Sequence, residues 1–152
     1  MSECYGESGE RCIMSPSYHH AYIAGNLIAV FKNLKKYSVF SELTLQIGEK
    51  DFIPDICLYS KRKISYGSGD IIRMTEMPML AAEILSQTQG SQEILDKFGI
   101  YFGAGIKSCW LVIPISHCVI VYSGTEKYQT FYAGDITDSV LDICIPADAV
   151  FE

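Results

Sequence analysis

The sequence predicts an α/β (α+β) protein in which a mixed β-sheet is flanked by helices. Two segments with helical periodicity, residues 17–36 and 91–104, alternate with two groups of segments that have the composition of β-strands. This order of elements favours helices packed on a mixed sheet. The chain has 152 residues, of which 49% are hydrophobic, so we expect one domain over residues 1–152 with a substantial core.

The first helix is expected over residues 17–36, with Ser15 as its cap and Pro16 in its first turn. A short edge strand is expected before it, at residues 11–14. The helix is predicted because apolar residues recur at helical spacing, namely Ile23, Leu27, Val30, Phe31 and Leu34.

After this helix the pattern changes to strands, which we expect at residues 39–47, 52–58 and 79–85. The third is nearly all apolar and is therefore expected to be buried on both faces. The second helix, 91–104, is expected to end near Gly103 and Gly105, because glycine readily adopts the backbone conformation that ends a helix. Further strands are expected at 108–113, 117–123, 127–132 and around 139–144.

Two acidic residues, Asp55 and Glu83, interrupt apolar strand-like runs. A carboxylate in a buried strand is costly unless it is paired, protonated or bound to a metal. We therefore expect the two residues on adjacent strands, with their carboxylates on the same side and close enough to share one ion. The alternative is that one or both lie at strand ends in contact with water.

Lys97 lies on the flank of the apolar stripe of the second helix, from which its ammonium group can reach a polar centre. Two carboxylates would supply oxygen ligands for Mg²⁺ or Mn²⁺, and the ion would activate a water and bind a phosphate oxygen. The lysine would orient that water or stabilise the transition state. These residues form a candidate phosphodiester-cleaving site, whereas an ordinary surface lysine is the alternative for Lys97.

The net charge of −6 argues against nonspecific nucleic-acid binding over the whole surface. One basic triplet, Lys61-Arg62-Lys63, follows the strand of Asp55 directly. We expect it to contact nucleic acid, and a solvated loop is the alternative interpretation.

The six cysteines include no C-x-x-C pair. Four of them lie in apolar runs and are expected in the core: Cys57, Cys109, Cys118 and Cys144. The other two, Cys4 and Cys12, could form a metal cluster with His19 and His20, but their spacing matches no common site.

Several function classes find no support in the sequence. No apolar run approaches the roughly 18 residues of a membrane span, and the N-terminus lacks an apolar signal core, so a cytoplasmic protein is expected. The absence of a G-x-x-x-x-G-K-[ST] loop argues against a nucleotide cofactor. A lone His117 is expected in a turn or on the surface, and Trp110 in the core.

The chain resembles the PD-(D/E)xK restriction-endonuclease-like superfamily and, more closely, the Uma-two family, domain of unknown function number 820. The similarity covers about residues 11–152, and its ordered spacing is more specific than any single motif. The matching segments are Met14-Ser15-Pro16-Ser17 followed by His20, Pro54-Asp55-Ile56, Leu80-Ala81-Ala82-Glu83-Ile84-Leu85-Ser86, Lys97 with Tyr101 and Gly105, Ser108-Cys109-Trp110-Leu111-Val112 followed by Pro114, and Val119-Ile120-Val121-Tyr122.

The resemblance implies a restriction-endonuclease-like core with a metal held by Asp55, Glu83 and the backbone carbonyl of Ile84. It also implies that the catalytic lysine has moved to the next helix, as Lys97, since Leu85 occupies its usual place. No glutamate lies in the first helix, and His20 or Asn26 is the expected site neighbour instead. Endonucleases that cut both strands often pair two sites about a two-fold axis, so a homodimer is expected.

Two departures from the family pattern concern Ile113, where an acidic residue is common, and the turn Ser86-Gln87-Thr88-Gln89. The leading hypothesis is a Mg²⁺-dependent endonuclease that hydrolyses DNA phosphodiester bonds. The alternative is a non-catalytic domain that keeps the fold and acts by self-association or partner binding.

Overall fold

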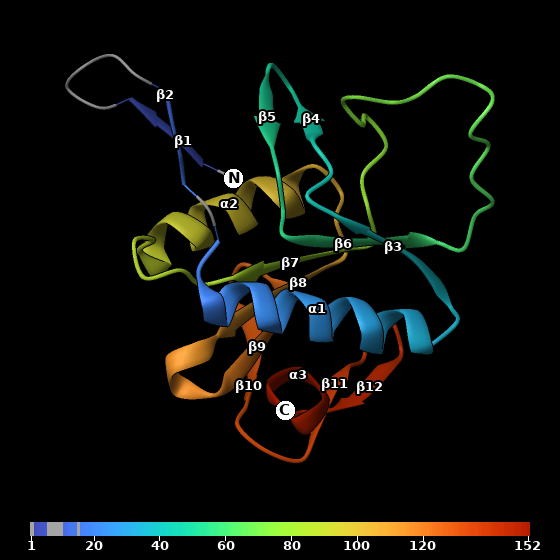
Figure 1. Cartoon of the computed structure of the whole chain (residues 1–152). Coiled ribbons are helices and arrows are strands. Elements are labelled where there is room, and N and C mark those ends of the chain that lie inside the picture. Colours follow the sequence, from blue (N-terminus) through green and yellow to red (C-terminus); the bar gives the residue numbers. More distant parts are fainter. Residues whose placement is uncertain (1, 6–10, 15) are drawn as a thin grey trace.

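The computed structural model describes residues 2–5, 11–14 and 16–152 and contains a six-stranded mixed sheet between two helices. Helix α1 (Tyr18–Asn33) packs on one face of this sheet and α2 (Ser91–Gly103) on the other (Figure 1). This arrangement confirms the predicted fold class. No helix in the described part of the chain is long and apolar enough to cross a membrane.

The strand order in the sheet is β10-β9-β8-β7-β6-β3. All neighbouring strands are antiparallel except β7 and β8, which are parallel because α2 forms the crossover between them. The six strands are β3 (Tyr37–Ser41), β6 (Ile56–Ser60), β7 (Leu80–Ile84), β8 (Ser108–Ile113), β9 (Cys118–Gly124) and β10 (Lys127–Phe131).

Smaller elements surround the sheet. They are the strand pairs β1 (Ser2–Tyr5) with β2 (Arg11–Met14), β4 (Leu45–Ile47) with β5 (Lys50–Phe52) and β11 (Asp135–Asp138) with β12 (Ile143–Pro146), a 3₁₀ turn, η1 (Pro114–Ser116), and a short C-terminal helix, α3 (Asp148–Phe151). The strand expected at residues 11–14 is thus β2, but it pairs with β1 outside the main sheet.

The alternation of side chains along β7 and β8 divides the core into two halves. Ala82 and Trp110 belong to the apolar cluster beneath α1, whereas Ala81 and Cys109 belong to the cluster beneath α2. The Trp110 ring meets the ring of Phe31 edge-on, with 5.2 Å between centroids. β7 is buried at every position, as the apolar sequence of this segment predicts.

The structure corrects several expected boundaries. The strand expected at 39–47 is two strands, β3 and β4, because the chain turns at Glu42, whose φ is 51°. The strand expected at 52–58 is likewise divided between β5 and β6, on either side of Pro54. The N-cap of α1 is Ser17, whose hydroxyl accepts the amide of His20, and Pro16 precedes the helix; Ser15 lies outside the described residues. Neither β11 nor α3 was expected.

A buried carboxylate, Asp138, ties β11 to the sheet. Its oxygens accept hydrogen bonds from the hydroxyl of Ser108, from the Trp110 indole at 2.8 Å, and from the amides of Val140 and Leu141. Four donors thus depend on one side chain that is 2% exposed.

We expect Asp138→Ala to lower the free energy of unfolding by roughly 3–5 kcal/mol, because each buried donor left without a partner costs about 1–3 kcal/mol. Urea denaturation measures the change. Asp135→Ala, at an exposed position of the same strand, serves as the control and should stay within about 0.5 kcal/mol of wild type. Equal stability of the two variants would contradict this role of Asp138.

Candidate functional site

The two acidic residues predicted to form a site lie side by side at one end of the β6–β7 pair. Asp55 directly precedes β6, and the register that pairs Ile56 with Ala82 places Asp55 opposite Glu83 when continued by one residue. Glu83 is 3% exposed, whereas the Asp55 side chain is 17% exposed. The two carboxyl groups are close enough that Asp55 raises the pKa of Glu83 through its charge and a shared hydrogen bond.

Pro54 explains why the backbone hydrogen bonds between β6 and β7 end at this point. The same register places it opposite Ile84, but proline has no N–H to donate to the Ile84 carbonyl. The Ile84 amide donates instead to Asp55 Oδ2, at 2.7 Å. Because the N–H and C=O of one residue in a strand point to the same side, the Ile84 carbonyl also points toward the Asp55 side of β7.

The first turn of α1 supplies the second partner of Asp55. His20 Nε2 lies 3.1 Å from Asp55 Oδ1, and His20 is buried. The hydrogen bond to Asp55, together with the charges of Asp55 and Glu42, raises the pKa of His20 although burial opposes this. His20 Nδ1 is buried without a hydrogen-bond partner among the described residues.

Asn26, the other expected site neighbour, lies elsewhere. Its amide donates to the carbonyl of Val150 at 2.9 Å and so attaches α1 to α3. Asn26 is six residues beyond His20, which places it about 9 Å further along α1 and on a different side of the helix. The expectation that it faces the site is therefore corrected.

Helix α2 supplies the partners of Glu83. The Tyr101 hydroxyl donates to Glu83 Oε1 at 2.9 Å, and Lys97 lies one turn earlier on the same helix. Burial raises the pKa of Glu83 to about 8 and the charge of Asp55 adds to this, while the charge of Lys97 and the Tyr101 hydrogen bond oppose it. Lys97 is half-buried and donates no hydrogen bond to any residue in the described ranges.

Sequence reasoning missed the bond between Tyr101 and Glu83. Tyr101 was named as part of the matching helix motif and its hydroxyl was given no role, although its position four residues after Lys97 places it on the same face of the helix. Its hydroxyl donates to Glu83 Oε1 and so fixes the orientation of this carboxyl group.

The donor set of the site consists of hard oxygen atoms. Among residues 2–5, 11–14 and 16–152, no three or more His, Cys, Asp and Glu side chains gather in a way that could hold a metal ion alone. Two carboxylates and the Ile84 carbonyl are oxygen donors of the kind that Mg²⁺ and Mn²⁺ bind, and these ions use few protein oxygens and keep several waters. The raised pKa of Glu83 also fits a cation site, because two adjacent carboxylates ionise together readily only when a cation compensates their charge.

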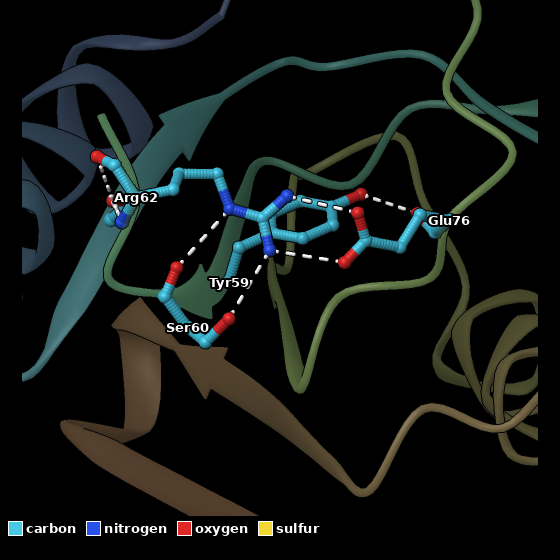
Figure 2. Close-up of polar contacts among 5 residues, drawn as sticks. Tyr59, Ser60, Arg62 and Glu76 are labelled. Carbon is cyan, nitrogen blue, oxygen red and sulfur yellow. Dashed lines mark hydrogen bonds and ion pairs between the residues drawn. The ribbon is translucent and has the colours of Figure 1, made fainter. Parts of the chain in front are cut away.

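The basic triplet lies at the other end of β6, about 20 Å from Asp55 at the usual strand rise. Lys61 and Lys63 are exposed. The guanidinium of Arg62, however, binds both carboxylate oxygens of Glu76 at 2.9 and 3.0 Å and lies 4.5 Å above the Tyr59 ring (Figure 2). Of the three cations, two are therefore available to a ligand and the third is engaged within the protein.

The remaining expected residues lie as follows. Cys57, Cys109 and Cys118 are buried, as predicted, and form no disulfide, but Cys144 is exposed, which corrects its expected place in the core. The side chains of Cys4 and Cys12 lie outside the described residues. Trp110 is in the core, and exposed His117 adopts φ 48° and stacks on Phe151 beside a hollow of about 230 Å³.

The mixed sheet with a helix on each face is a nuclease-like fold, and comparison with known proteins agrees with this class. The chain belongs to the Uma2 family, whose model is described as "Putative restriction endonuclease" and matches residues 6–142. This confirms the family expected from the motifs.

One solved structure with the same fold is that of "a putative nuclease belonging to DUF820" from Anabaena variabilis ATCC 29413. The TM-score is 0.74, with 19% sequence identity over 99% of this chain and 89% of that chain. At this identity the similarity concerns the fold alone. A comparison with curated proteins found no match.

The raised pKa of Glu83 predicts how stability depends on pH in metal-free protein. The folded state holds the Glu83 proton up to about pH 8, whereas the unfolded chain releases it near 4.5. Stability from this group is therefore complete below about pH 4.5 and is lost as the pH rises to about 8, at about 1.4 kcal/mol per pH unit as an upper limit.

The glutamine side chain of Glu83→Gln carries no charge at any pH, so this variant does not lose stability through ionisation. Its free energy of unfolding should therefore exceed that of wild type by an amount that grows from pH 5 to pH 8. Urea denaturation with a chelator present measures this difference. Glu126→Gln, at an exposed position, should instead follow the wild-type curve. Parallel curves for Glu83→Gln and wild type would show that Glu83 ionises normally in the folded protein.

Proposed function

We propose that the protein is an endonuclease that hydrolyses DNA phosphodiester bonds with the help of Mg²⁺ or Mn²⁺. The observation that supports this most is the pair of adjacent carboxylates, Asp55 and Glu83, with the charge of Lys97 close enough to act on Glu83. A buried carboxylate of raised pKa beside a second carboxylate and a lysine is an arrangement found more often at functional sites than in passive cores. Membership of the Uma2 family gives independent support.

In this proposal Asp55, Glu83 and the Ile84 carbonyl hold the ion. When bound, the ion would supply an activated water and bind a phosphate oxygen. The chain itself orients the ligands: the Ile84 amide and His20 hold the two oxygens of Asp55, and Tyr101 holds one oxygen of Glu83. Fixed ligands lose less conformational entropy when the ion and the substrate bind.

Lys97 serves as the electrostatic residue of the proposal. Lys97 is half-buried and makes no competing hydrogen bond within the described ranges. A cation held in this way stabilises negative charge that develops on phosphate in the transition state, or orients the attacking water.

We also propose that the protein is cytoplasmic and forms a homodimer. The dimer is proposed because endonucleases that cut both strands of a duplex often pair two active sites about a two-fold axis. Sedimentation at micromolar concentration tests this assembly. A dimer supports it, and a monomer in the presence of DNA and metal contradicts it.

We expect Asp55→Ala to abolish metal-dependent cleavage of DNA, because it removes a charged ligand and leaves the Ile84 amide without its acceptor. Lys97→Ala should reduce the cleavage rate about 10²- to 10³-fold while metal affinity stays nearly unchanged. Plasmid nicking and calorimetric titration with Mn²⁺ measure the two properties separately.

Exposed residues of the same type provide controls, namely Asp135→Ala and Lys107→Ala, both of which should cut as wild type does. If wild-type protein cuts no form of DNA with either metal, or if Asp55→Ala cuts equally well, the nuclease proposal fails. A non-catalytic role of the same fold would then replace it.

A further inference from the structure

The connection between β6 and β7, residues 61–79, forms a long loop that extends beyond the sheet (Figure 1). It contains no helix or strand, and its one isolated bridge joins Met74 to Leu45. Long loops without secondary structure are uncommon in compact domains and often carry function.

Two ends of this loop are clamped together at its base. Arg62 forms a two-pronged ion pair with Glu76 and lies over the ring of Tyr59, whose hydroxyl donates to the Glu76 carbonyl at 2.8 Å (Figure 2). The Arg62 guanidinium also donates to the carbonyl and hydroxyl of Ser60. Because the planar Arg62 guanidinium binds two carboxylate oxygens at once, the pair fixes the relative orientation of the two side chains as well as their distance.

A second attachment holds the returning half of the loop against the β4–β5 hairpin. Arg73 donates twice to Asp51 Oδ1, at 2.6 and 2.9 Å. The backbone of Met74 exchanges hydrogen bonds with Thr44 and Gln46, each at 2.8 Å. Residues 63–72 therefore project from two fixed points.

The charge of the loop is opposite in sign to that of the protein. Residues 61–79 contain four basic and two acidic side chains and so carry +2, whereas the whole chain carries −6. Both acidic residues and two of the four cations have partners: Arg62 binds Glu76, Arg73 binds Asp51, and Asp70 caps the amide of Ile71. Lys61 and Lys63 are the exposed cations that remain.

The projecting segment also exposes large apolar side chains. Tyr66 is 92% exposed and Ile72 83%, and Ile71 and Ile64 are exposed as well. Exposed apolar side chains gathered on one segment mark an interaction surface. Beside lysines they match nucleic acid, in which anionic backbone and stackable bases alternate.

We propose that loop 61–73 binds the nucleic-acid substrate, with Lys61 and Lys63 contacting phosphates and Tyr66 contacting bases. The clamp formed by Arg62, Glu76 and Tyr59 holds the loop in the conformation that binds. The identity of the ligand as a substrate rests on the nuclease function proposed above. Lys61, at the base of the loop, lies about 20 Å from Asp55, which is less than one 34 Å turn of duplex, so one DNA molecule is long enough to contact both.

The first test measures DNA affinity by fluorescence anisotropy in the presence of a chelator, so that no cleavage is required. Lys61→Ala/Lys63→Ala should weaken binding and lower the slope of log affinity against log salt by about 2, one unit for each phosphate contact. Lys32→Ala/Lys127→Ala removes two exposed lysines elsewhere and should leave the slope unchanged. Equal slopes for the two double variants overturn the proposal.

The second test separates preorganisation from charge. Glu76→Gln removes a negative charge and should strengthen DNA binding if charge alone matters. With the clamp broken, we expect it to weaken binding about 2- to 5-fold and to increase amide exchange in residues 63–72. Stronger binding by Glu76→Gln overturns the role of the clamp.

Tyr66→Ala should reduce affinity at least about 5-fold for single-stranded oligonucleotides, while Tyr132→Ala, also exposed but on another segment, should not.

If the loop variants change self-association and leave DNA affinity unchanged, the loop is a contact between protein copies and the proposal is overturned. If DNA binding depends on the loop but no DNA is cut, the role of the loop is supported and the proposed nuclease function is contradicted. If DNA is cut but the affinity for DNA does not depend on the loop, the nuclease function is supported and the role of the loop is overturned.

Discussion

The site depends on the way the β6–β7 ladder ends. Proline at position 54 cannot donate the next ladder bond, and the Asp55 carboxylate takes the Ile84 amide in its place. The missing proline donor therefore leaves the Ile84 carbonyl facing the site, and the Asp55 side chain accepts the hydrogen bond of the Ile84 amide. The neighbouring Glu83 is then buried against a second carboxylate, at a cost that a cation, a proton or fixed donors must offset.

The two helices each meet one of these carboxylates. The first turn of α1 brings His20 to Asp55, and α2 brings Tyr101 and the charge of Lys97 to Glu83. The apolar clusters on the two sheet faces hold the helices in these positions, so packing that stabilises the fold also sets the geometry of the polar residues. A polar centre supported in this way on strands and helices is held more rigidly than one built on loops.

Much of this could be predicted from the sequence. The apolar run around Glu83 predicted a fully buried strand, and the ordered motifs predicted the family. The adjacency of Asp55 and Glu83 was predicted because both residues interrupt apolar runs. The turn at Glu42 could not be predicted, because a positive φ in a glutamate leaves no mark in composition or periodicity.

Contacts between segments far apart in the chain were also missed. The bond of Asn26 to Val150 and that of Arg62 to Glu76 depend on how the elements pack, and periodicity within one element carries no information about either. A basic triplet therefore looked uniform in sequence although one of its members is engaged within the protein. The clamp at the loop base gives that arginine a different role from its two neighbours.

The central claim is that Asp55 and Glu83 hold one divalent ion between them. Crystals soaked in Mn²⁺, with anomalous scattering used to locate the metal, test it most directly. We expect one ion bound by a carboxylate oxygen of each residue and by the Ile84 carbonyl, with waters at the other positions. Absence of an ion from this place at millimolar Mn²⁺, or an ion bound only elsewhere, would contradict it.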